Sequence, residues 1–166
     1  MTYLKEGHGV RVRPMRTADG EALAALHREA IMRTDPKFYS DRQRKSWADG
    51  LTADGYALAL EDGEIIEVAV NAEGAPIAFC GRRTFGVAGL YVHPDWQGKG
   101  IGSLLLRRAE KALQKEGVLS LRVDASLPAV EFYERHQYRF AEERSHKTRG
   151  GAEVKISRMT KAIDKP

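Results

Sequence analysis

Three glycines within five residues, Gly98, Gly100 and Gly102, separate a strand-like run from a long amphipathic helical pattern. Glycine adopts backbone dihedrals that side chains forbid, so several N–H groups of such a turn can point at one place. The helix that opens there adds the positive end of its dipole, which favours an anion. The segment therefore predicts a phosphate-binding turn in a domain that combines strands and helices.

The spacing of these glycines excludes two common phosphate-binding motifs. A P-loop has a longer gap between its glycines and then Lys-Ser or Lys-Thr, whereas Lys99 lies between two glycines. The dinucleotide-binding pattern G-x-G-x-x-G requires a third glycine where this chain has Ser103. A glycine-rich turn that binds no ligand remains as an alternative.

The pattern Gln97-x-x-Gly100-x-Gly102, preceded by the run from Leu90 to Asp95, resembles the acetyl-CoA-binding signature of the GNAT superfamily of N-acetyltransferases. In that family the loop amides hold the coenzyme A pyrophosphate, and the preceding strand pairs with the pantetheine arm. The resemblance implies acetyl-CoA as cosubstrate. The residues expected to bind it are Leu90, Tyr91, Val92, Gln97, Gly98, Lys99, Gly100, Ile101, Gly102, Ser103 and Ser126.

Two further glycines, Gly86 and Gly89, lie inside the strand before the loop. Glycine weakens a strand and normally marks a bulge or the close approach of another group. In the GNAT family this strand bulges and splays from the next one, so the resemblance implies that the cofactor lies against it. A bulge that merely twists the sheet is the alternative.

The segment from Ser126 to Glu134 resembles the family's N-x-x-A-x-x-F-Y motif, with Ser126 in place of the usual asparagine. Tyr133 matches the motif without alteration. A hydroxyl near the departing thiolate can donate a proton to the sulfur, so Tyr133 is the candidate general acid; a core aromatic is the alternative. Gln137 replaces a glycine that the family often has there.

The chain offers no carboxylate from Gly86 to Gly89, where many relatives carry a general base. Deprotonation of the amine through ordered water is the expected substitute, and Asp124 is a second candidate that could equally be a turn residue. Cys80 could form an acyl-enzyme, but we find no histidine pattern that would activate it. We therefore expect Cys80 to be a buried strand residue and the attack to be direct.

The segment around Phe38, Tyr39 and Trp47 corresponds to the region that commonly selects the acceptor in this family, so these aromatics are expected to bind the acceptor or to pack helix against sheet. Arg82 could bind an acceptor carboxylate or lie in a solvated turn. The expected acceptor is a small-molecule or peptide amine. The predicted activity is acetyl transfer from acetyl-CoA to a primary amine through a tetrahedral intermediate; the alternative is a non-catalytic acyl-CoA sensor.

Composition agrees with one ordinary globular domain spanning residues 1–166. The chain is 42% hydrophobic and 30% charged, with a net charge of +4 and one cysteine, which together suit a cytoplasmic protein without a disulfide. No apolar run could span a membrane, and the basic clusters resemble solvated faces more than a nucleic-acid site. The five histidines lack zinc-ligand spacing, so we expect no metal.

Hydrophobic periodicity predicts a strand, helices, three antiparallel strands, a helix from Gly100 to Glu116, a strand, a helix to about Arg135 and two strands joined at Gly150-Gly151. Helix caps are expected at Thr17, Ser40, Thr52 and Ser126. This order is that of GNAT folds. The expected fold class is therefore mixed α/β, with a mostly antiparallel sheet of about seven strands flanked by helices and strands 4 and 5 splayed to admit acetyl-CoA. An exposed C-terminal edge strand could pair in a homodimer.

Overall fold

The strands and helices follow one another along the chain in the order that the sequence predicts. The computed structural model describes residues 9–165. The strands are β1 (Arg11–Pro14), β2 (Ile65–Val70), β3 (Pro76–Arg83), β4 (Gly86–Val92), β5 (Ser120–Ser126), β6 (Arg139–Lys147) and β7 (Glu153–Ala162). The helices are α1 (Gly20–Met32), α2 (Asp41–Ala48), α3 (Ala53–Glu61), α4 (Ile101–Lys115) and α5 (Val130–Arg135).

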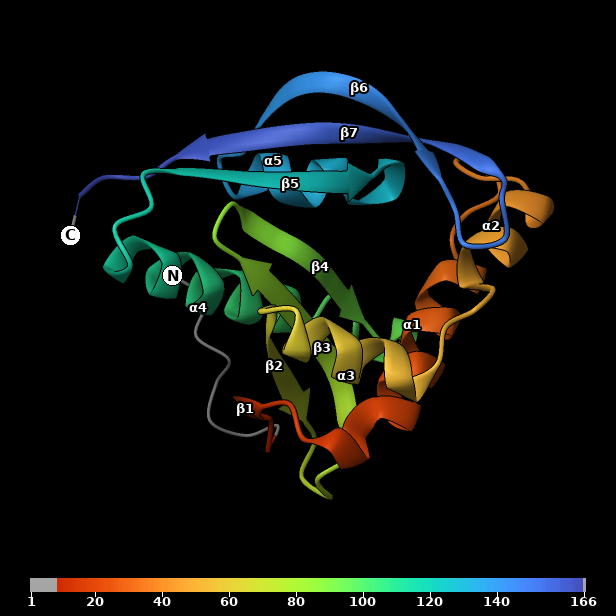
Figure 1. The fold of residues 1–166 in the computed structure, drawn as a ribbon, viewed down its shortest axis with the longest axis horizontal. Coiled ribbons are helices and arrows are strands. Elements are labelled where there is room, and N and C mark those ends of the chain that lie inside the picture. Colours follow the sequence, from red (N-terminus) through yellow and green to blue (C-terminus); the bar gives the residue numbers. More distant parts are fainter. Residues whose placement is uncertain (1–8, 166) are drawn as a thin grey trace.

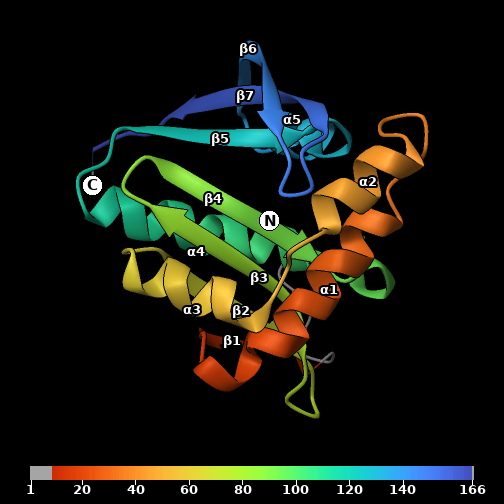
Figure 2. The same ribbon diagram turned by 45° about the vertical axis from the view of Figure 1, so that its right-hand side comes forward.

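All seven strands form one sheet in the order β1-β2-β3-β4-β5-β7-β6. Every neighbouring pair is antiparallel except β4 and β5, which run parallel. Helices α4 and α5 cover one face of the sheet and α1 and α3 the other (Figure 2), with an apolar cluster under each layer. The predicted fold class is therefore confirmed.

The two halves of the sheet separate between β4 and β5. These strands pair only at Gly86 with Arg122 and at Val87 with Val123, and they diverge along the rest of their length (Figure 1). At the same point the register between β3 and β4 shifts, which leaves Ala88 as an extra residue in β4. Such a bulge bends the strand and ends its pairing. The splay predicted for strands 4 and 5 is thus built into β4.

The starts of the first two helices differ in how well the sequence predicted them. Ser40 caps α2 as expected, because its hydroxyl accepts a hydrogen bond from the Gln43 N–H at 3.2 Å. The predicted cap at Thr17 is wrong. A 3-10 turn precedes α1, and the carboxylate of Asp19 accepts the Arg16 N–H at 2.7 Å.

The predicted cap at Ser126 is also wrong. The chain after β5 first forms a 3-10 turn that contains Pro128, and the Ser126 side chain makes no capping hydrogen bond there. Thr52 likewise occupies the N-cap position of α3 without a side-chain bond. After α5, Gln137 adopts a φ of 69°, the left-handed conformation for which relatives use glycine.

The hairpin of β6 and β7 folds back onto the N-terminal half of the chain. At its tip the Thr148 hydroxyl lies 2.6 Å from the Ser46 hydroxyl of α2, and the Gly150 N–H donates to the Ser46 carbonyl at 2.9 Å. Tyr39 adds a second link, since its hydroxyl donates to the Lys155 carbonyl and accepts from the Leu127 N–H. These bonds hold the α1–α2 segment against β7.

Candidate active site

A cavity of about 590 Å³ lies at the splay of β4 and β5. It crosses the sheet, because Leu90 and Val92 pack on the α4 side whereas Tyr91 packs on the α1 side. The cavity brings together most of the residues that the sequence predicted for the site. These are Phe38, Tyr39, Trp47, Leu90, Tyr91, Val92, Gln97, Gly98, Gly100, Ile101, Gly102, Ser103, Ser126 and Tyr133.

The glycine loop joins β4 to α4 at one end of this cavity. Gly98 and Gly100 have φ values of 74° and 82°, which only glycine adopts easily, and Gly100 is the N-cap of α4. The Gln97 side chain donates to the Val92 carbonyl at 3.1 Å and so ties the loop to the end of the strand. The first N–H groups of a helix have no partners within it, so this end of the cavity suits an anion.

Tyr133 enters the same cavity from α5. Only 4% of the residue is exposed, and its ring packs edge-on against Phe132 and Tyr138 at centroid distances of 5.1 and 5.3 Å. Burial raises the pKa of Tyr133 well above its usual value, so the hydroxyl stays protonated. Across residues 9–165 that hydroxyl has no hydrogen-bond partner. A protonated hydroxyl that opens into a cavity is suited to donate a proton.

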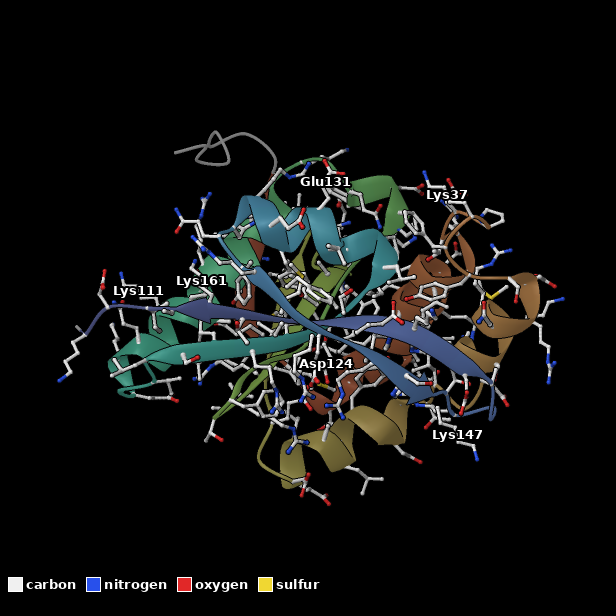
Figure 3. The ribbon with its side chains drawn as sticks, turned by 90° about the horizontal axis from the view of Figure 1, so that it is seen from above. Lys37, Lys111, Asp124, Glu131, Lys147 and Lys161 are labelled. Carbon is white, nitrogen blue, oxygen red and sulfur yellow. The ribbon has the colours of Figure 1, made fainter. Side chains whose placement is uncertain are left out.

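Asp124, the candidate base, does not line the cavity. It lies within β5 and not after it, and its carboxylate accepts two hydrogen bonds from Arg158 of β7 at 2.8 and 2.9 Å. That hydrogen bonding lowers the pKa of Asp124. Figure 3 shows Asp124 and Glu131 of α5 on opposite sides of β7. Because strand residues alternate between faces, Asp124 points away from Tyr133 and its role as a base is not supported.

Arg82 and Lys99 are the two predicted site residues that the cavity leaves out. Arg82 forms an ion pair with Glu116 at the end of α4, at 2.9 Å, so the structure does not support the prediction that it binds an acceptor carboxylate. Lys99 places its ammonium 4.9 Å from the centre of the ring of Trp96, a residue that does line the cavity.

Cys80 and His27 are buried away from the cavity. Burial raises the pKa of the Cys80 thiol to about 12, so a nucleophilic thiolate is not available and the expected structural role holds. His27 lies under Tyr91, with ring centroids 3.7 Å apart, and its Nδ1 is 2.9 Å from the Tyr56 hydroxyl. Burial lowers the pKa of His27 to about 3, which keeps the ring neutral.

The structure contains neither a metal cluster nor a membrane span within its described part. No group of three His, Cys, Asp or Glu side chains in residues 9–165 could hold a metal ion. Across the same residues, no helix has the length and apolar character needed to cross a membrane.

Comparison with known proteins gives the family. Residues 21–138 match the model of the acetyltransferase (GNAT) family. The chain belongs to this family. This GNAT chain is 25% identical over 143 residues to the uncharacterised N-acetyltransferase YafP of Escherichia coli (strain K12), a match that covers 86% of the chain and 90% of the relative.

Solved structures agree with this assignment. A GCN5-related N-acetyltransferase from Rhodopseudomonas palustris matches 92% of the GNAT chain and 95% of its own, with a TM-score of 0.83 and 29% identity. The PaiA N-acetyltransferase from Thermoplasma acidophilum, solved in complex with coenzyme A, matches 93% and 99%, with a TM-score of 0.69 and 23% identity. The family model and the N-acetyltransferase relative together make the chain an acyltransferase.

The GNAT cavity also has lining residues that the sequence did not reveal, among them Arg33, Trp96, Phe132 and Arg135. Trp96 and Phe132 adjoin predicted residues and could have been found from that proximity. Arg33 and Arg135 could not, because each forms an ion pair with an acid four residues earlier, Glu29 and Glu131, a pattern typical of any solvent-facing helix.

Proposed function

We propose that this GNAT domain transfers the acetyl group of acetyl-CoA to a primary amine by direct attack. One observation supports the proposal above all: the glycine loop, the splayed edge of β4 and the Tyr133 hydroxyl meet in a single cavity. A phosphate site, an extended groove and a proton donor are the three features that this chemistry requires.

The residues present fit the pyrophosphate and the pantetheine arm of the cosubstrate. N–H groups of the loop from Gly98 to Ser103 would hold the pyrophosphate. Beyond Val87, no described strand pairs with the edge of β4 that faces β5, so the backbone of Leu90 to Val92 is open to an extended amide-containing chain. The Ser126 side chain lines the same groove and would add a hydrogen bond.

In the proposed reaction the amine nitrogen forms a bond to the thioester carbon and the carbon–sulfur bond breaks. A backbone N–H near Val92 would stabilise the negative carbonyl oxygen of the intermediate. The Tyr133 hydroxyl would give its proton to the departing sulfur, and the proton of the amine would leave through water. This assignment rests on the position of Tyr133 in the cavity and on its hydroxyl being protonated.

Calorimetric titration with acetyl-CoA tests the cosubstrate, with ATP, NAD and desulfo-CoA as comparison ligands. We expect saturable binding of acetyl-CoA and none of ATP or NAD. The absence of acetyl-CoA binding by a folded sample would refute the proposal.

The role of Tyr133 is tested by Tyr133→Phe, which should lower kcat by about 100-fold or more while the Kd of acetyl-CoA stays unchanged. Tyr138→Phe is the matched control, because its buried hydroxyl has no partner among the described residues and lies outside this cavity. Equal turnover by the two variants would remove Tyr133 from the mechanism.

The oligomeric state of the protein is the subject of a separate proposal. β6 is an edge strand whose residues are exposed along its whole length, and it arches over β7 (Figure 1). Such an edge can pair with the same strand of a second copy, so we propose a homodimer. A monomeric mass from size-exclusion chromatography with light scattering would contradict it.

A further inference from the structure

The end of the cavity on the α1 and α2 side carries four aromatic side chains, together with the polar residues Arg33, Thr34 and Asp35. We call this region the acceptor end; its residues are Ala30, Ile31, Phe38, Tyr39, Trp47 and Tyr91. Trp47 and Tyr39 pack edge-to-face at a centroid distance of 5.2 Å. Four aromatic side chains around one space give a wall suited to a flat apolar body.

Few polar groups at the acceptor end are free to hold a charged body. The Tyr39 hydroxyl is occupied twice, by the Lys155 carbonyl at 2.7 Å and the Leu127 N–H at 2.8 Å, so Tyr39 presents its ring. Arg33 at the rim is paired at 2.9 Å with both Glu29 and Asp95. A second carboxylate or cation on the acceptor would therefore lose its hydration without a prepared partner.

The acceptor end also offers little help in removing a proton. Among the described residues that line the cavity, Asp35 alone carries a carboxylate. It lies in the solvated α1–α2 segment, where it accepts the Lys37 N–H at 2.9 Å, and that bond lowers its pKa. An alkylammonium ion with a pKa of ~10.4 would have to lose both its water and its proton there. An amine that is already neutral at pH 7 avoids both costs.

Resting on the proposed function above, we propose that the acceptor is a weakly basic amine carried on an aromatic ring. The aromatic wall binds the ring by its faces and edges. The apolar surroundings favour the neutral amine, which replaces the missing carboxylate base. The same surroundings discriminate against amino acids and polyamines, whose additional charges meet only the already paired Arg33 and the already hydrogen-bonded Asp35.

A matched panel of amines tests this inference through release of free coenzyme A at pH 7, corrected for the reaction without enzyme. The panel is 4-methoxyaniline, 2-phenylethylamine, L-phenylalanine and putrescine, which change in turn the basicity, the charge and the ring. We expect kcat/KM to be highest for 4-methoxyaniline and about tenfold or more lower for the last two. L-phenylalanine or putrescine as the best substrate would overturn the inference.

Two variants localise the effect. Phe38→Ala removes one aromatic wall of the acceptor end, and Phe140→Ala removes an exposed phenyl group from β6 as a control. We expect Phe38→Ala alone to raise the KM for 4-methoxyaniline about tenfold, with the Kd of acetyl-CoA unchanged. Equal effects of the two variants would count against the assigned position of the ring.

A measurement of acetyl-CoA binding distinguishes a failure of the proposed acceptor class from a failure of the proposed function. A protein that binds acetyl-CoA but prefers 2-phenylethylamine to 4-methoxyaniline, or acetylates neither, overturns the acceptor class alone. A folded protein that binds no acetyl-CoA overturns the proposed function and the acceptor class with it.

Discussion

Gly86 is the residue whose replacement should most directly disturb the splay. It lies in the short region where β4 and β5 still pair, with a φ of 139° that L residues rarely adopt. A Cβ added there would come within 2.2 Å of the Arg122 carbonyl oxygen and 2.7 Å of the Arg122 nitrogen. Because these are backbone atoms, no side-chain rotation relieves the contact, and Gly86→Ala must push β5 away from β4.

The cost follows from two contributions. The unusual φ alone costs about 1–3 kcal/mol for a residue with a side chain. Separation of the strands also endangers the hydrogen bond from the Arg122 N–H to the Phe85 carbonyl, 2.8 Å long, and its neighbour in the ladder. Each such bond contributes about 0.5–1.5 kcal/mol, so the total loss is about 2–6 kcal/mol, a large share of the ~5–15 kcal/mol typical of a folded protein.

Gly74→Ala separates strain from steric contact. Gly74 has a φ of 83° but no atom within 4 Å of the added Cβ, so only backbone strain of about 1–2 kcal/mol remains. Urea denaturation of both variants gives the difference in free energy of unfolding. If Gly86→Ala is no more destabilising than Gly74→Ala, the close contact between β4 and β5 does not hold the splay as argued.

Three further predictions concern stability. The pKa of His27 is about 3 in the folded chain and 6.5 without burial, so above pH 6.5 the residue is neutral in both states and does not lower the free energy of unfolding. Below pH 6.5 the unfolded chain binds a proton that the folded chain does not, and the free energy of unfolding falls by about 1.4 kcal/mol per pH unit. Denaturation of His27→Gln from pH 7 to 4 should show a shallower loss, and identical pH profiles would contradict this. Tyr39→Phe leaves one backbone donor and one acceptor without a partner and should cost about 1–3 kcal/mol, whereas Tyr138→Phe should cost little; equal losses in urea would count against the role of the Tyr39 hydroxyl. Gln137→Gly removes left-handed strain and should raise the free energy of unfolding by about 0.5 kcal/mol, so a lower melting temperature would be the wrong sign.

Local signals made the sheet and the glycine loop predictable. Mostly apolar runs define β2 and β3, and the glycines around Lys99 leave few options for the backbone there. The topology could then be predicted because the order of the elements resembles that of GNAT folds. The site residues near the loop followed from the same motif, since Gln97 and Gly102 are fixed by spacing alone.

Residues whose role depends on a distant partner could not be predicted. Arg82 was expected near the acceptor. Its ion pair with Glu116 was missed because nothing in the sequence around Arg82 shows that Glu116 lies beside it in space. Asp124 is similar, since its partner Arg158 comes from β7. Ser126 failed as a cap for a local reason: the chain continues into a 3-10 turn with Pro128, and the helix begins only at Val130.

The link between Tyr39 and β7 joins residues 116 positions apart, and the Ser46–Thr148 contact spans 102. Closing such long loops is slow, and proteins rich in these contacts fold more slowly than those held by local ones. During synthesis the β1–β4 half leaves the ribosome first, while the aromatic surface of α1 and α2 is still uncovered by the hairpin of β6 and β7. Until the hairpin of β6 and β7 has been synthesised and docked, that surface is a place where a nascent chain can bind a chaperone or aggregate.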